Sequence, residues 1–388
     1  MVEFDTVYDR RNTNCSKWDS ITDTYGEDGL LPLWIADMDF KANPPVLEAL
    51  EQTAKQGILG YSPAPNSLYE AIQRWQKRRH DYSVNKEAIL FNSGVVPSLS
   101  LAIQAYTEPG DAILIHDPVY PPFAKVVEQN NRRLIRNQLL IEQEHFVMAL
   151  EEMEKQIVAE NVRLFILCNP HNPGGRVWTK SELEAFGQLC AKYDVLVISD
   201  EIHQDLIFAP HVFTTFANVH PSFKDFSITL TAATKTFNLA GIKNSMIFIE
   251  NPDLRKKFIA AQERNFQNEI NIFGYVGTEA AYQHGDNWLE ELLVYLTENI
   301  DTVSTFLQTE LPKVKMMRPE GTYLIWLDFS SLGLTDAQLQ KQLIHKGKVV
   351  LNPGISFGPN GTQHMRLNVA CPKETLIEGL RRIKYSFE

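Results

Sequence analysis

Six short apolar runs in the middle of the chain restrict the possible folds more than any other feature of the sequence. Each run is continuous rather than alternating, which is typical of strands whose two faces are both buried, and helical stretches separate several of them. The runs lie at residues 88–91, 112–115, 164–168, 195–199, 228–230 and 246–249. This pattern predicts an α/β domain whose mainly parallel sheet is flanked by helices.

The stretches around these runs carry helix signals. Thr179 and Glu182 are spaced as a capping box, and apolar residues from Leu183 to Tyr193 then recur on one face of the predicted helix. Further helices are predicted at residues 46–56, 68–79 and 288–307.

With 388 residues, the chain is long enough for a large domain and a second, smaller one. We expect the large domain at residues 46–286, because all six apolar runs fall there. The irregular N-terminal arm at residues 1–45 and the segment 287–388 are predicted to form a small α+β domain. Strand-like stretches in that segment lie at residues 321–329, 348–351 and 364–369.

Charge and composition exclude some partners. The net charge of −11, with no basic face, argues against nucleic acid or an anionic membrane. No apolar run approaches the roughly 20 residues that span a bilayer, and the N-terminal residues do not have the pattern of a secretory signal. We therefore expect a cytoplasmic protein. Its four widely spaced cysteines fit reduced thiols: Cys15, Cys168, Cys190 and Cys371.

Polar residues follow several of the predicted strands, where ligands gather in an open α/β sheet. Asp200, Asn172 and Tyr120 each follow an apolar run, and a Ser93-Gly94 turn follows another. Each has a plainer interpretation as well, since Asp200 could cap a helix, Asn172 could serve a turn and Tyr120 could belong to the core. The residues alone leave these alternatives open.

Lys235 follows the run at 228–230 and precedes apolar residues that pack rather than solvate. Desolvation disfavours the ammonium form, so this setting predicts a lowered pKa. A neutral amine is the form that attacks a carbonyl carbon. The alternative is an ordinary solvated lysine.

The segment from Ala232 to Gly241, Ala-Ala-Thr-Lys-Thr-Phe-Asn-Leu-Ala-Gly, resembles the cofactor-lysine segment of pyridoxal 5′-phosphate (PLP) enzymes with the aspartate-aminotransferase fold. More narrowly, it is similar to the MalY/PatB-type cystathionine β-lyases, or C–S lyases. The resemblance spans nearly the whole chain. It implies PLP-dependent transferase fold type I and a homodimer with shared active sites.

The resemblance assigns roles around the cofactor ring. Lys235 matches the lysine that holds PLP and removes the substrate's Cα proton, and Asp200 matches the aspartate beside the pyridine nitrogen. Asn172 matches the residue bonded to the ring hydroxyl, and Tyr120 matches the tyrosine stacked on the ring. His203 stands where many aminotransferases have a tyrosine near that hydroxyl, which points to the lyase branch.

The resemblance also implies a phosphate site. The amides of Gly94, Val95 and Val96 open a predicted helix, where free N–H groups and the helix dipole attract an anion. Tyr61 matches a tyrosine that reaches the phosphate of the neighbouring subunit's cofactor. Lys243 occupies the place of an arginine that grips the phosphate in many relatives, and it keeps the charge without the fork.

For the substrate, Arg366 matches the arginine that binds the α-carboxylate. A planar guanidinium suits a bidentate contact with a carboxylate. The backbone near Ile35 and Ala36 belongs to a segment, Trp34 to Phe40, that resembles the lyase branch and borders that carboxylate. The aromatic residues of this segment could equally be core.

The implied activity is α,β-elimination of L-cystathionine, L-cysteine or related S-substituted cysteines to a thiol or hydrogen sulfide, pyruvate and ammonia. The alternative within PLP chemistry is an aminotransferase, which also begins with loss of the Cα proton to Lys235. His203 and residues 34–40 favour the lyase by resemblance. A regulatory binding protein is a third possibility, although Lys235 and Asp200 are both present.

Two other signals are weak. Gly354-Ile-Ser-Phe-Gly358 matches the nucleophile motif of serine hydrolases, but that motif requires a helix directly afterwards, and Pro359-Asn360-Gly361 follows instead. The histidines at residues 203–220 show no convincing ligand spacing, so no metal is expected.

Overall fold

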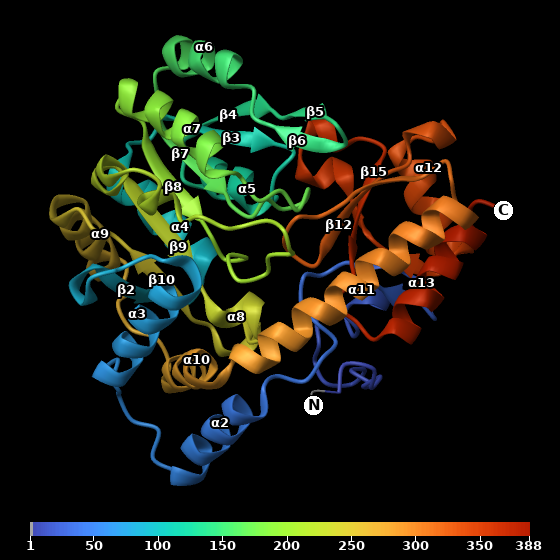
Figure 1. The fold of residues 1–388 in the computed structure, drawn as a ribbon, viewed down its shortest axis with the longest axis horizontal. Coiled ribbons are helices and arrows are strands. Elements are labelled where there is room, and N and C mark those ends of the chain that lie inside the picture. The colour runs from blue at the N-terminus through green and yellow to red at the C-terminus, as the bar shows by residue number, and fades with distance from the viewer. Residues whose placement is uncertain (1–2) are drawn as a thin grey trace.

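The computed structural model describes residues 3–388 and contains two main sheets, one of seven strands and one of four (Figure 1). The larger sheet has the order β2-β10-β9-β8-β7-β3-β4. Its strands are β2 (Ile89–Asn92), β3 (Ala112–Asp117), β4 (Arg133–Gln138), β7 (Val162–Cys168), β8 (Leu196–Asp200), β9 (Ser227–Thr231) and β10 (Ser245–Phe248). Each of the six apolar runs therefore forms a strand of this sheet.

The larger sheet is mainly parallel, as predicted. Strands β4, β3, β7, β8 and β9 run parallel, whereas β10 is antiparallel to both of its neighbours. Strand β4 was not among the predicted runs. It lies at the sheet edge, and polar residues interrupt its apolar ones, so it lacks a continuous apolar run.

Helices cover both faces of this sheet, and alternate strand residues enter different cores. On β7, Leu164 and Ile166 pack in a cluster with residues of α4, α5 and α9, whereas Phe165 and Leu167 pack with residues of α6 and α7. Burial on both faces explains the continuous apolar runs. The helices are α4 (Val95–Tyr106), α5 (Pro122–Gln129), α6 (Leu150–Glu160), α7 (Lys180–Lys192) and α9 (Pro252–Arg264).

The capping box predicted for α7 is present. The Glu182 N–H donates to the Thr179 hydroxyl, and the Glu182 carboxylate accepts from the Thr179 N–H at 2.7 Å. The predicted helices at 46–56 and 68–79 each begin two residues earlier than expected. They are α2 (Pro44–Gln56) and α3 (Asn66–His80), and both pack against α10 (Ile272–His284).

The second sheet is antiparallel, with the order β11-β12-β15-β14. Its strands are β11 (Lys315–Met317), β12 (Leu324–Asp328), β14 (Asn352–Pro353) and β15 (His364–Asn368). Helices α11 (Asp286–Glu310), α12 (Asp336–Lys341) and α13 (Lys373–Ser386) accompany it. The two sheets fall in the two segments expected to form separate domains, but the boundaries at residues 45/46 and 286/287 stay a prediction.

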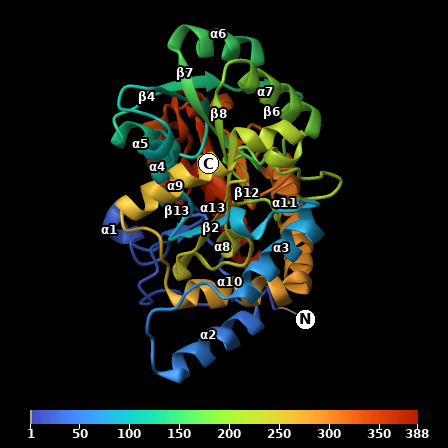
Figure 2. The same cartoon turned by 90° about the vertical axis from the view of Figure 1, so that its left-hand side faces the viewer.

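The N-terminal arm joins the part of the chain that holds the second sheet (Figure 2). Its short strand β1 (Leu31–Pro32) pairs in parallel with β13 (Val349–Val350), and helix α1 (Ile21–Tyr25) precedes it. A separate hairpin consists of β5 (Leu140–Glu142) and β6 (His145–Val147).

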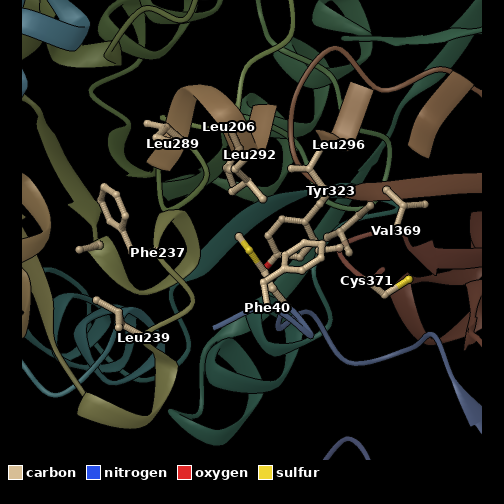
Figure 3. Close-up of a cluster of buried hydrophobic side chains, with 14 of the residues drawn as sticks. Phe40, Leu206, Phe237, Leu239, Leu289, Leu292, Leu296, Tyr323, Val369 and Cys371 are labelled. Carbon is tan, nitrogen blue, oxygen red and sulfur yellow. The ribbon is translucent and has the colours of Figure 1, made fainter. Parts of the chain in front are cut away.

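One buried cluster connects the arm to both sheets. Figure 3 shows Phe40 of the arm beside Tyr323, with Leu292 and Leu296 of α11 above them and Phe237 to one side. Phe237 directly follows α8 (Ala233–Thr236), the short helix that carries Lys235. The cluster therefore places the arm, α11 and the Lys235 turn in one packed unit.

Two further observations concern the sequence motifs. Residues 354–361 form two successive 3₁₀ turns, so the helix that a hydrolase nucleophile motif requires does not follow Gly358. Within residues 3–388, no helix is both long and apolar enough to cross a membrane. The same residues contain no group of three or more side chains arranged as metal ligands.

Candidate active site

A cavity of about 580 Å³ opens where the carboxyl ends of several strands of the larger sheet meet the arm and the second sheet. It brings together almost every site residue predicted from the sequence. The predicted residues that line it are Ile35, Ala36, Gly94, Val95, Val96, Tyr120, Asn172, Asp200, His203, Lys235, Lys243 and Arg366.

Lys235 lies on α8, one turn beyond the end of β9, and its side chain enters the cavity. Its Nζ donates to the Ala36 carbonyl oxygen at 2.5 Å. Burial and the nearby Arg366 charge lower its pKa to about 8, and Asp37 and Asp200 act in the opposite direction. At pH 7 roughly one tenth of this amine is therefore neutral, far more than for an ordinary lysine with a pKa of about 10.4.

Asp200 is the last residue of β8 and is buried. Burial raises the pKa of its carboxyl group to about 7, although the Ile202 N–H bond to Oδ1 (3.1 Å) and the Lys235 charge oppose the change. A cation placed against this carboxylate would hold it ionised. The position suits a protonated ring nitrogen.

His203 is also buried, on the turn that follows Asp200. Burial, together with the charges of Lys235 and Arg366, lowers its pKa well below the usual range, so the ring is neutral. Within residues 3–388 its Nδ1 has no hydrogen-bond partner. A neutral imidazole with a free nitrogen can pair with a hydroxyl group of a bound molecule.

Arg366 projects from β15 and has only neutral hydrogen-bond partners in the described part of the chain. Its Nη1 donates to Asn172 Oδ1 at 3.0 Å, and its Nη2 donates to Asn352 Oδ1 at 2.5 Å and the Trp34 carbonyl oxygen at 2.9 Å. Burial lowers its pKa to about 10, and its Nε has no partner there. A buried cation without a counter-charge favours an anion in the cavity.

The start of α4 gives the cavity the features of a second anion site. Gly94 precedes α4 without a side-chain cap, and Val95 and Val96 form the start of that helix. The free N–H groups and positive dipole at a helix start favour a phosphate. Lys243 lines the same cavity and contributes a positive charge.

Tyr61 is the predicted site residue that the chain does not bring to this cavity. It is fully exposed and lines a separate surface depression with Tyr69, Phe91 and Tyr275. Its assignment depends on a second subunit, which a single chain does not test.

Two residues near Arg366 and Lys235 had no distinctive signal in the sequence. Asn352 is placed by the pairing of β14 with β15, in which it lies opposite Arg366. Tyr323 donates to the Ala36 carbonyl oxygen at 3.0 Å. The strand register identifies Asn352 as a neighbour of Arg366, whereas the spacing of residues along the chain does not.

The side chains present fit PLP. The cavity offers a lysine amine for an aldehyde, a buried carboxylate for a ring nitrogen, a neutral histidine and Asn172 for a ring hydroxyl, and a helix start for a phosphate. Tyr120 adds an aromatic wall suited to a flat ring. Together with the two-sheet fold, these features define a PLP-dependent enzyme of fold type I.

Comparison with known proteins supports the assignment to PLP-dependent enzymes of fold type I. The profile of the family "Aminotransferase class I and II" matches residues 30–383, and the chain belongs to this PLP-dependent family. It is 45% identical to cystathionine β-lyase PatB of Bacillus subtilis (strain 168) over 383 residues, 99% of each chain. It is 33% identical to protein MalY of Escherichia coli (strain K12), over 98% of this chain and 97% of that one.

A solved structure extends the likeness to three dimensions. The PLP-bound C–S lyase from Staphylococcus hominis matches with a TM-score of 0.94 and 33% sequence identity, over 100% of this chain and 98% of that one. The chain is thus a MalY/PatB-type member of its family, as the sequence motifs indicated.

Proposed function

We propose that this protein catalyses α,β-elimination of L-cystathionine, L-cysteine and S-substituted cysteines, releasing a thiol or hydrogen sulfide, pyruvate and ammonia. It is a PLP-dependent carbon–sulfur lyase, as its full-length similarity to cystathionine β-lyases indicates. The observation that carries the proposal is the Lys235 amine, whose pKa is near neutrality, in one cavity with Asp200 and Arg366.

Lys235 acts as the base in this proposal. PLP, when bound, supplies a protonated ring that accepts the electron pair left at Cα when the Cα proton is removed. The Lys235 amine takes that proton, and its lowered pKa places it near the optimum for proton transfer at neutral pH. With PLP bound, the negative charge of Asp200 would keep a proton on the ring nitrogen.

Arg366 binds and orients the substrate by its α-carboxylate. Asn352, Asn172 and the Trp34 carbonyl accept hydrogen bonds from the guanidinium, so its orientation is set before substrate arrives. When PLP is bound, Tyr120 would pack on its ring, and His203 and Asn172 would pair with its ring hydroxyl. Gly94, Val95, Val96 and Lys243 would hold the phosphate, and Ile35 and Ala36 would border the substrate carboxylate.

An aminotransferase is the second candidate, because it uses the same lysine and the same electron sink. The names of the similar proteins favour the lyase. The test is incubation of the holoenzyme with L-cystathionine or L-cysteine in the absence of any 2-oxo acid. A lyase releases pyruvate and thiol over many turnovers, whereas an aminotransferase stops without an acceptor. Lys235→Ala is the control and should give neither product.

The proposal includes a cytoplasmic homodimer with a shared active site. The exposed Tyr61, with exposed Ile58 and Leu59 beside it, supports a contact between subunits at this surface. Tyr61 then reaches the phosphate of the partner subunit's cofactor. Hybrids of Tyr61→Ala and Lys235→Ala subunits should regain activity, because one of their two sites is intact. Absence of recovery would argue against a shared site.

A further inference from the structure

Residues 34–40 of the arm, of which Ile35 and Ala36 line the active-site cavity, form a wall segment in which several carbonyl groups accept hydrogen bonds from side chains. Asn368 Nδ2 donates to the carbonyl oxygens of Ile35 and Asp37, at 2.7 Å each. The carbonyl oxygen of Ala36 lies between these two and accepts from Lys235 Nζ at 2.5 Å and from the Tyr323 hydroxyl at 3.0 Å. A carbonyl oxygen has two lone pairs, so both are used.

Asn238 connects this wall to the turn that carries Lys235. It lies three residues after Lys235 in the left-handed backbone region (φ +57°). Its Oδ1 accepts from the Met38 N–H at 3.0 Å, and its Nδ2 donates to the carbonyl oxygens of Met38 and Phe40 at 2.9 Å each. The side chain therefore binds the wall two residues beyond Ala36.

Ion pairs with earlier residues of the arm also hold this segment. The Lys17 ammonium is fully buried and contacts Asp39 Oδ2 at 2.7 Å, and Arg10 contacts Asp39 at 2.6 Å and Asp37 at 2.8 Å. These ion pairs fix residues 34–40 to earlier residues of the arm, whereas Asn238 fixes them to the turn that carries Lys235. Asn238 thus links the Lys235 turn directly to the segment that carries the Ala36 carbonyl oxygen.

We propose that Asn238 is a positioning residue for the Lys235 base. By holding Ala36 in place, it lets the free Lys235 amine donate one N–H to the Ala36 carbonyl oxygen, which turns the amine's lone pair towards the substrate's Cα proton. In the step itself the Cα–H bond breaks and an N–H bond forms at Nζ. The inference rests on the proposed function, which makes Lys235 the base.

Two substitutions test the role of Asn238. Asn238→Gly removes the side chain, and glycine adopts the left-handed backbone without strain. Asn238→Asp keeps an acceptor for the Met38 N–H but loses both donated bonds. Asn299→Asp is the matched control, because Asn299 is buried on α11 and its Nδ2 likewise bridges two carbonyl groups, those of Val369 and Cys371, at 2.9 Å each. Neither Asn238 nor Asn299 lines the active-site cavity.

The measurements separate positioning from general stability. With the holoenzyme we expect both Asn238 variants to lower kcat by about 10- to 100-fold with little change in KM, as for a displaced reacting group. The kinetic isotope effect with Cα-deuterated substrate should rise, because proton removal becomes slower. Asn299→Asp should lower the melting temperature but leave kcat and the isotope effect unchanged.

Cofactor-free protein provides an independent readout. In Asn238→Gly, hydrogen exchange at the Met38 amide should accelerate, and the pH midpoint for acylation of Lys235 should move away from its wild-type value. In Asn299→Asp both should match wild type. If either Asn238 variant folds and matches Asn299→Asp in kcat and isotope effect, the inference is overturned. Failure of the wild-type enzyme to release pyruvate would instead overturn the proposed function.

Discussion

Asp205 offers a sharp test of how the fold supports the Lys235 turn. It is buried, five residues after Asp200, and its carboxylate joins three side chains. Oδ1 accepts from Trp75 Nε1 at 2.9 Å and lies 2.8 Å from His80 Nε2, and Oδ2 accepts from the Thr236 hydroxyl at 2.7 Å. Since Thr236 directly follows Lys235, this carboxylate anchors the turn from behind.

The magnitude follows from counting the groups that Asp205→Ala leaves without a partner. Trp75, His80 and Thr236 each lose a buried hydrogen bond, at about 1–2 kcal/mol per unsatisfied group. We therefore expect a loss of about 3–6 kcal/mol in the free energy of unfolding. Thr236→Val, which breaks a single bond, should cost about 1–2 kcal/mol, and Thr236→Ser should cost less because it keeps the hydroxyl.

The loss should depend on pH. Burial alone would raise the pKa of Asp205, but the hydrogen bond and charge of His80, with the bonds from Thr236 and Trp75, lower it overall. A carboxyl group whose pKa is lower in the folded state stabilises the fold above its unfolded pKa of about 3.9. This contribution disappears as the pH falls through the folded-state pKa. The difference between wild type and Asp205→Ala should therefore shrink in acid.

The assay is urea unfolding of cofactor-free protein, followed by tryptophan fluorescence and circular dichroism, so that cofactor binding does not add to stability. It is repeated from neutral pH down to about pH 2, because the contribution of Asp205 is lost only below the ordinary aspartate pKa of about 3.9. A loss no larger for Asp205→Ala than for Thr236→Val would refute the reasoning. A difference that grows as the pH falls would refute the pH argument.

Three further predictions follow from single contacts. Because burial lowers the pKa of Lys235 to about 8, acylation of its amine in cofactor-free protein should have a pH midpoint near 8. Asp200→Asn should lower that midpoint, since Asp200 favours the ammonium form. A wild-type midpoint near the ordinary lysine value of about 10.4 would contradict this. Arg366→Lys should raise KM for amino-acid substrates by about 10- to 100-fold through loss of the bidentate contact, and an unchanged KM would show that the carboxylate binds elsewhere. Gly187→Ala should destabilise the fold by about 1–3 kcal/mol, because the new methyl group would lie 2.1 Å from the Phe223 ring. Gly241→Ala is the control and should cost little, because the space around Gly241 is open. Equal melting temperatures for the two variants would refute the packing argument.

Local sequence rules predicted the strands best where burial is two-sided. Strands β3 and β7 appear as continuous apolar runs because helices cover both of their faces. The edge strand β4 was missed, since its partly exposed residues mix polar and apolar types. Apolar content carries no information about direction, so the antiparallel orientation of β10 could not be read from its run.

The residues of the candidate site differ in what the sequence could predict about them. Asp200, Asn172 and Tyr120 follow predicted strands, so a general rule about strand ends pointed to them. Arg366 and Lys243 were found only by resemblance to a family. Tyr323 and Asn238 were not assigned a role, because each contacts a residue about 200 or more positions away in the sequence.

By itself, the sequence determined which segments are buried strands and helices and which chemical groups end those strands, because these depend on neighbouring residues only. The tertiary structure alone decided that the Ala36 carbonyl meets the Lys235 amine, that Asn352 lies opposite Arg366, and that burial brings the pKa of Lys235 to about 8. The physical reason is that strand register, desolvation and contacts between distant segments arise only when the whole chain packs, and no spacing along the chain encodes them directly.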